Sequence, residues 1–150
     1  MKAPKNFPVN TIQAQRALTY IKATHGAAKF EEALMECFEA TWQNQEDLGS
    51  PDVVRTVFAR VFDSATELDA IMEASAQAEW KKALTDKTKE ALERGAYGAP
   101  WFWVRNCRRG EEREGPFFGS DRFAFMWEFL GLGWRDVEVE HLGTGGGAKL

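Results

Sequence analysis

Residues 95–130 read GAYGAPWFWVRNCRRGEEREGPFFGSDRFAFMWEFL, and this segment carries the clearest pattern of secondary structure in the chain. A proline at position 100 leads into residues 101–104, a short aromatic and apolar run of the kind that forms strands. A charged turn over residues 106–115 follows, and then a second short apolar run over residues 116–118. The pattern therefore predicts a β-hairpin directly after the proline.

A helix is predicted directly after the hairpin. Gly119, Ser120 and Asp121 are typical of a loop that ends in a helix N-cap, with the acid in the first turn, where the helix dipole favours negative charge. Residues 123–130 are apolar on most sides of a helix, and we expect such a helix to be buried. The predicted order is proline, strand, turn, strand and helix.

Composition limits the class of protein. The chain has 150 residues, of which 44% are hydrophobic and 13% aromatic, so we expect one globular domain with a sizeable core. The net charge of -4 argues against nucleic acid or an anionic membrane as the main partner. No apolar run approaches the roughly 20 residues of a membrane span.

Residues 10–94 predict five helices and no strand. The predicted N-caps are Asn10 in a capping box with Gln13, Ser50 before Pro51, Ser64 in a capping box with Glu67, and Ser75. The expected buried faces are Ala14, Ala17, Leu18 and Ile21 in the first helix, and Phe30, Leu34, Phe38, Thr41 and Trp42 in the second. Gly95 is placed to end the fifth helix.

The motif G-x-x-G-A-P, the aromatic run and F-F-G-S-D-R before an apolar helix together resemble the C-terminal half of a thioredoxin-like domain. The resemblance is to the DsbA-like branch, which includes kappa-class glutathione transferases and 2-hydroxychromene-2-carboxylate isomerases. It implies that Pro100 is a cis-proline. The segment F-P-V-N-T followed by A-Q-R-A-L resembles the start of the helical insertion of this family.

The resemblance implies a mostly α protein with a small β part, an incomplete thioredoxin-like (DsbA/kappa) fold. Its expected parts are an extended lead-in over 1–9, a helical insertion subdomain over 10–94, the C-terminal thioredoxin-like half (strand, strand, helix) over 95–132 and a tail over 133–150. The family begins with a strand-helix-strand unit that carries an activating serine or cysteine. Residues 1–9 cannot supply that unit. We therefore expect an N-terminally truncated member with low or no activity by itself, either because the sequence is a fragment of a longer protein or because the activating half has been lost.

The same resemblance implies a glutathione site. The backbone of Ala99, before Pro100, would bind the cysteinyl part of glutathione as a short strand does. Ser120 and Asp121 would hold the γ-glutamyl end. The alternative is that Ser120 and Asp121 are only an N-cap and a first-turn acid. Trp101 stands where the family usually has a small residue, and it either fills the pocket or serves as a platform for an aromatic substrate.

Five other aromatic residues of this segment are expected in the core rather than in a ligand site, namely Trp103, Phe117, Phe118, Trp127 and Phe129.

The sequence gives little support for thiol-disulfide or metal chemistry. The two cysteines, Cys37 and Cys107, do not form a C-x-x-C motif, which disfavours a thiol-disulfide oxidoreductase. We expect two reduced structural thiols, or alternatively a reactive Cys107 beside Arg108 and Arg109. His25 and His141 are isolated from any metal-ligand spacing, so no metal site is expected.

The sequence ends in Ala148-Lys149-Leu150, a close variant of the S-K-L peroxisomal address. The glycine-rich residues 143–147 would present it to an import receptor. We therefore expect a peroxisomal protein, which would otherwise be cytoplasmic.

The expected function follows from the resemblance, namely a glutathione transferase or isomerase-like protein that acts on small hydrophobic or aromatic molecules with glutathione as co-substrate. No catalytic residue is predicted in the chain. The alternative is a non-catalytic pseudoenzyme or assembly subunit, because two strands and one helix cannot cover their own sheet edges. We therefore expect a homodimer or a complex with a partner chain.

Overall fold

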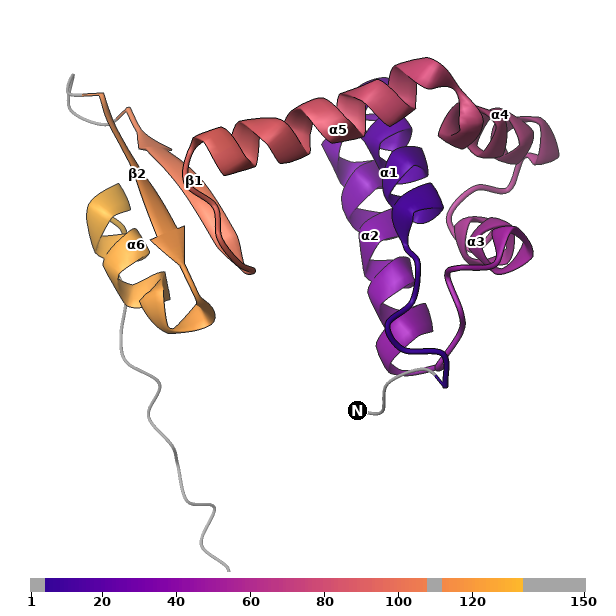
Figure 1. Cartoon of the computed structure of the whole chain (residues 1–150), viewed down its shortest axis with the longest axis horizontal. Coiled ribbons are helices and arrows are strands. Elements are labelled where there is room, and N and C mark those ends of the chain that lie inside the picture. The colour runs from indigo at the N-terminus through magenta and orange to yellow at the C-terminus, as the bar shows by residue number, and fades with distance from the viewer. Residues whose placement is uncertain (1–4, 108–111, 134–150) are drawn as a thin grey trace, which may run out of the picture. The chain divides into compact units, whose positions relative to one another are not determined.

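The computed structural model describes residues 5–107 and 112–133, and within them the chain forms six α-helices and one β-hairpin (Figure 1). The elements are α1 Ile12–Thr24, α2 Gly26–Trp42, α3 Pro51–Phe58, α4 Ala65–Ala76, α5 Ala78–Glu93, β1 Trp101–Asn106, β2 Arg113–Phe118, the 3-10 helix η2 Ser120–Arg122 and α6 Phe123–Leu130. The predicted mostly helical fold with a small β part is confirmed. None of the described helices is both long and apolar enough to cross a membrane.

The chain divides into two compact units, Met1–Ala91 and Leu92–Leu150, and the division falls in the last turn of α5. The predicted import tripeptide Ala148-Lys149-Leu150 and His141 lie outside the described residues. Arg108 and Arg109, the predicted neighbours of Cys107, lie outside them too.

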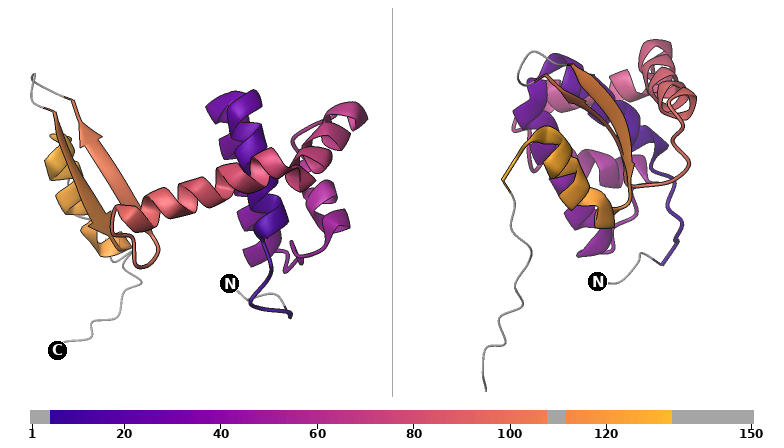
Figure 2. Two further views of the ribbon diagram at one scale, coloured as in Figure 1. Left: turned by 45° about the horizontal axis from the view of Figure 1, so that its top comes forward. Right: turned by 90° about the vertical axis from the view of Figure 1, so that its left-hand side faces the viewer.

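The first unit is a helical cluster in which α1 packs against α2 and α4, and α2 packs against α3 (Figures 1 and 2). The predicted buried face of the first helix is confirmed, and it comprises Ala14, Ala17, Leu18 and Ile21. The largest fully buried apolar side chains of this unit are Phe58, Ile21, Ile71, Val54 and Val57. Burial of these side chains is the main favourable free energy that holds the unit together.

The predicted face of the second helix is partly wrong. Phe38 is 51% exposed, whereas the buried residues of α2 are Ala33, Cys37, Ala40 and Thr41. Small side chains let two helices approach closely, so this narrow face is the one that turns inward. Phe30 and Leu34 pack only partly buried against the core.

Tertiary contacts change two N-cap predictions. The Asn10 side chain accepts a hydrogen bond from the Ile12 N–H at 3.2 Å at the start of α1, as its predicted role requires. The Gln13 half of the capping box is wrong, because the Gln13 amide donates to the Ser75 hydroxyl at 3.2 Å. Ser75 is not a cap, because α4 continues through it to Ala76. Its buried hydroxyl donates to the Met72 carbonyl oxygen at 2.6 Å. A buried polar group needs partners, and Gln13 and Met72 provide them.

The other helix boundaries agree with the sequence pattern. The Ser64 hydroxyl accepts a hydrogen bond from the Glu67 amide at 3.3 Å, as its predicted capping box requires. Ser50 has extended backbone at the N-cap of α3, and Pro51 is the first helical residue. Gly95 has a φ of +88° after α5, and its N–H donates to the Leu92 carbonyl.

The second unit contains the predicted hairpin. β1 pairs antiparallel with β2, from Trp101 opposite Phe118 to Asn106 opposite Arg113. α6 covers one face of the two strands (Figure 2). The rings of Phe102 and Phe117 contact α6 side chains, and the Asn106 amide donates to the Phe129 carbonyl oxygen at 2.6 Å.

The expectation of a buried last helix is wrong for the described residues. No residue of α6 is fully buried, and Phe125 is 56% exposed. A helix that is apolar on most sides needs cover on most sides. In the described part of this unit, α6 packs against one face of a two-stranded sheet, so its other sides stay exposed.

Replacing Ile71 by alanine should destabilise the helical unit by about 2–5 kcal/mol, because Ile71 is fully buried and its removal leaves a cavity. Urea unfolding followed by far-ultraviolet circular dichroism measures the change. Met35→Ala is the matched control, since Met35 is 64% exposed on α2, and its effect should stay within about 0.5 kcal/mol. Equal losses for both variants would contradict this assignment of the core.

The two thiols should differ in reactivity. Burial, with Glu36 nearby, raises the pKa of Cys37 to about 11, whereas Cys107 is exposed. Because the thiolate is the reactive form, a thiol reagent at neutral pH should modify Cys107 quickly and Cys37 only after denaturation. The Cys107→Ser variant should show no fast-reacting thiol in the native state. Two fast thiols in the native wild-type protein would show this difference to be wrong.

Candidate functional site

One backbone hydrogen bond connects the loop before β1 to the loop after β2. The Gly119 N–H donates to the Pro100 carbonyl oxygen at 2.9 Å. β1 starts directly after Pro100 and β2 ends directly before Gly119, so the register brings both loops together. The structure thus places the predicted segments 99–100 and 120–121 side by side.

Two glycines shape this junction. Gly119 has a φ of +88°, and a carboxylate oxygen of Asp121 occupies the space that a Cβ atom at Gly119 would need. At Gly98, a Cβ atom would lie 2.7 Å from a carbon of the Phe118 ring. Glycine therefore permits the turn at one position and the close approach of an aromatic ring at the other.

The four predicted site residues all lie at the surface. The Ala99–Pro100 peptide is cis, as the resemblance implied, and both residues are exposed. Ser120 opens η2, but its side chain makes no capping hydrogen bond, so its assignment as a side-chain N-cap is wrong. The Asp121 carboxylate lies 3.5 Å from the Nε atom of Arg122, and both side chains are largely exposed.

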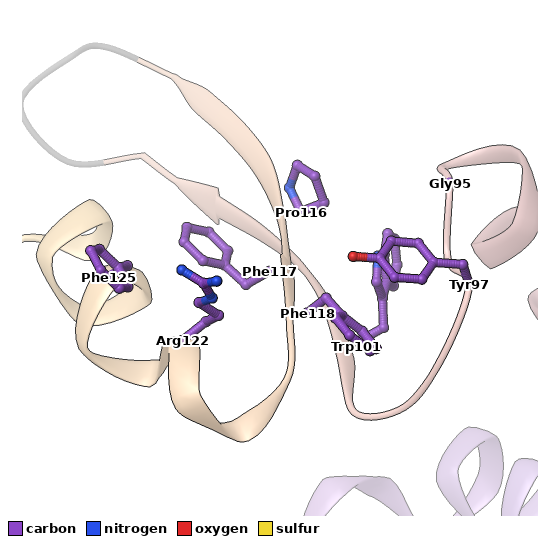
Figure 3. A pocket seen from close by; sticks show the side chains of 8 residues that line it. All are labelled: Gly95, Tyr97, Trp101, Pro116, Phe117, Phe118, Arg122 and Phe125. Carbon is purple, nitrogen blue, oxygen red and sulfur yellow. The ribbon is translucent and has the colours of Figure 1, made fainter.

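An open pocket of about 400 Å³ lies beside this junction (Figure 3). It is lined by Gly95, Tyr97, Trp101, Pro116, Phe117, Phe118, Arg122 and Phe125. In Figure 3, Arg122 lies between Phe117 and Phe125 on the α6 side, and Tyr97 and Trp101 lie across β2. The guanidinium of Arg122 is 5.7 Å from the centre of the Phe125 ring. The pocket is therefore aromatic, with one cation in its wall.

The residues that line the pocket are not the site residues expected from the sequence. None of the four predicted residues lines it, whereas their chain neighbours Trp101 and Arg122 do. Phe117 and Phe118, expected in the core, also line it, and Phe118 is 37% exposed. Tyr97 was not predicted either, although its position between two glycines, in G-A-Y-G, was a usable signal. Arg122 directly follows Asp121, and this adjacency was the signal available for it.

A polar cluster lies on the sheet face opposite α6. The Trp103 indole N–H donates to the Glu114 carboxylate at 2.5 Å, and Arg105 pairs with the same carboxylate at 2.7 Å. The Arg94 guanidinium lies 4.7 Å from the centre of the Trp103 ring. The hydrogen bond from Trp103, together with the charges of Arg105 and Arg94, lowers the pKa of Glu114 below its ordinary value. Glu114 therefore fixes the orientation of Trp103 at this face.

The arrangement can bind a small molecule that combines peptide-like and apolar parts. The exposed residues Ala99, Ser120, Asp121 and Arg122 offer polar groups at the junction, and aromatic rings line the pocket beside it. Among residues 5–107 and 112–133, no group of three or more histidine, cysteine, aspartate or glutamate side chains is placed to hold a metal ion.

Comparison with known proteins adds an independent observation. Residues 1–131 match the family of the DSBA-like thioredoxin domain. The chain is 26% identical to human glutathione S-transferase kappa 1 over 136 residues. This alignment covers 87% of the chain and 58% of the length of the human protein.

Removing the Glu114 carboxylate should lower the stability of the hairpin and reduce its pH dependence. Because the pKa of Glu114 is below its ordinary value of 4.5, the carboxylate stabilises the folded hairpin above that pH. The contribution is lost as the pH falls through the depressed pKa. Glu114→Gln should therefore unfold at lower denaturant concentration than the wild type at neutral pH, and at nearly the same concentration in strong acid.

Tryptophan fluorescence during urea unfolding measures this difference. Glu128→Gln, an exposed position on α6, is the control and should follow the wild type at both pH values. A Glu114→Gln curve that is parallel to the wild-type curve over the whole pH range would count against the assigned role.

Proposed function

The chain belongs to the DSBA-like thioredoxin domain family, and from this premise we propose that it binds glutathione where the loop before β1 meets the start of α6. We propose further that it acts, with glutathione as co-substrate, on small hydrophobic or aromatic molecules. The similarity to human glutathione S-transferase kappa 1 supports the choice of glutathione. The chain spans 58% of the length of that protein, so the activity is part of the proposal.

The observation that carries the proposal is the hydrogen bond from the Gly119 N–H to the Pro100 carbonyl oxygen. It brings together two segments that are separated in sequence by the whole hairpin. The exposed residue Ala99 lies on one side of the junction, and the exposed residues Ser120 and Asp121 lie on the other. A short peptide laid across the junction would meet both.

The groups at the junction fit the chemistry of glutathione, which carries two carboxylates, one ammonium group and a central thiol. The backbone of Ala99 would pair with the cysteinyl residue as one strand pairs with another. The Ser120 hydroxyl and the N–H groups of η2 would face the γ-glutamyl carboxylate, and Asp121 would face its ammonium group. Arg122 adds a second group that can bind a carboxylate.

The aromatic pocket supports the second half of the proposal. Tyr97, Trp101 and Phe118 offer ring faces to an apolar acceptor molecule beside the bound thiol. In this scheme the thiolate of glutathione is the nucleophile. The described residues bind and orient the two molecules, and we assign no residue of the chain to thiol activation.

Calorimetric titration of the full chain with glutathione tests the site. The double variant Ser120→Ala, Asp121→Asn should bind glutathione about tenfold or more weakly, since it loses hydrogen bonds to charged groups worth about 1.5–3 kcal/mol each. Asp63→Asn, Ser64→Ala is the matched control. It changes the same two residue types in the first unit and should leave the affinity unchanged.

A dipeptide control tests the orientation of the ligand. Cysteinylglycine lacks the γ-glutamyl group, so the wild type should bind it more weakly than glutathione. The Ser120, Asp121 double variant should bind cysteinylglycine with the same affinity as the wild type does. Two results would refute the proposal, namely no binding of glutathione by the wild type at millimolar concentration, or equal affinity of the wild type and the double variant.

A further inference from the structure

Trp101 is the residue for which the sequence pattern allows two roles, because it either fills the pocket or serves as a platform for a ring of the substrate. Its half-buried side chain lines the open pocket of about 400 Å³ beside the junction. A tryptophan that filled the pocket would leave no such space next to it. The structure therefore favours the role of a platform.

One face of the Trp101 ring is occupied by a second indole. Side chains alternate along a strand, so Trp101 and Trp103 share one face of β1. Their rings stack, with centres 6.1 Å apart and planes inclined by 30°. Trp103 lies toward the hairpin turn, whereas Ala99 and Pro100 precede Trp101 in the chain. The other face of Trp101 is therefore the one nearer to the junction.

Trp103 is itself held by a carboxylate. Its indole N–H donates to an oxygen of Glu114 at 2.5 Å, and the guanidinium of Arg94 lies 3.7 Å from the same oxygen. The second oxygen of Glu114 pairs with Arg105 at 2.7 Å. Arg94 also lies 4.7 Å from the centre of the Trp103 ring. Trp103 is thus fixed both at its polar edge and at its ring.

We propose that Trp101 is the platform on which a flat ring of the acceptor molecule stacks beside the bound thiol, and that Trp103 and Glu114 are positioning residues that hold this platform. The inference rests on the proposed function, because it concerns the same pocket. It narrows the substrate class to molecules with a planar ring. A flat ring touches an indole over its whole face, whereas a puckered, saturated ring of equal size touches it at fewer atoms.

The contacts behind Trp101 prepare it for binding. Ordering a mobile side chain during association costs free energy, and a side chain that is already held avoids this cost. Trp101 is held through its stack on Trp103, and Trp103 through its hydrogen bond to Glu114. The hydrogen bond from Trp103 and the charges of Arg105 and Arg94 lower the pKa of Glu114, so the anchor is ionised at neutral pH.

Two conjugates of glutathione that differ only in their ring test the platform. S-benzylglutathione carries a flat ring, and S-(cyclohexylmethyl)glutathione carries a puckered one. In calorimetric titrations of the full chain, the wild type should bind the benzyl conjugate about two- to tenfold more tightly, as expected for one aromatic pair. Trp101→Leu should bind both conjugates equally. Trp80→Leu, which removes an indole from α5 in the first unit, is the matched control and should keep the preference.

Three further variants test the positioning residues. Trp103→Phe keeps a ring but loses the N–H donor, and Glu114→Ala removes the acceptor. Both should weaken the preference for the benzyl conjugate and leave the affinity for unmodified glutathione unchanged. Glu114→Gln keeps an oxygen that can accept the indole N–H, so it should retain more of the preference than Glu114→Ala does.

A spectroscopic signal reports the stack itself. Two stacked indoles give an exciton couplet in ultraviolet circular dichroism, which Trp101→Leu should abolish and Glu114→Ala should weaken. If glutathione binds but the wild type and Trp101→Leu show the same preference, the inference is wrong and the proposed function stands. A Glu114→Ala variant that keeps both the couplet and the preference would overturn the positioning role. Absence of binding by glutathione and by both conjugates would refute the inference and the proposed function together.

Discussion

The hydrogen bond from the Gly119 N–H to the Pro100 carbonyl oxygen sets the phase of the β1–β2 ladder, and the second unit depends on it. In this phase Phe102 and Phe117 turn toward α6, while Trp101 and Phe118 turn to the other face. A shift by one residue would exchange the two faces and separate α6 from its aromatic contacts. The same bond brings the loops of the proposed glutathione site together. The packing of α6 and the geometry of the candidate site thus both depend on one backbone contact.

The helices of the first unit could be predicted from the spacing of apolar residues, but not all of their contacts could. The face of α1 was correct because Ala14, Ala17, Leu18 and Ile21 recur at helical spacing and are the residues buried. The face of α2 was partly wrong because large apolar side chains such as Phe38 were given more weight than the alanines, although close helix contact favours small residues. Local patterns also could not show that the Gln13 amide donates a hydrogen bond to the Ser75 hydroxyl, since the two residues are 62 positions apart in sequence.

The parts of the candidate site that are contiguous in sequence could be predicted. The motif around Pro100 and the one around Ser120 are each contiguous, and the hairpin between them brings their ends together. The pocket is different, because its wall combines Tyr97, Arg122 and Phe125 from a loop, η2 and α6. Which side chains line it depends on how the strands and α6 pack, and a linear motif does not contain that information. Phe117 and Phe118 were expected in the core because they are large and apolar. The size of a side chain does not show whether its ring is buried or lines a pocket.

Pro116 also limits how far the sheet can grow. Cross-β polymers need a donor and an acceptor row on both sides of every strand, so that each added copy offers a fresh template. In this hairpin the outer side of β2 lacks a backbone donor at its centre, because Pro116 has no N–H. Pro116 therefore disfavours the addition of a strand at the outer side of β2, and so protects this edge of the hairpin from growth into a fibre.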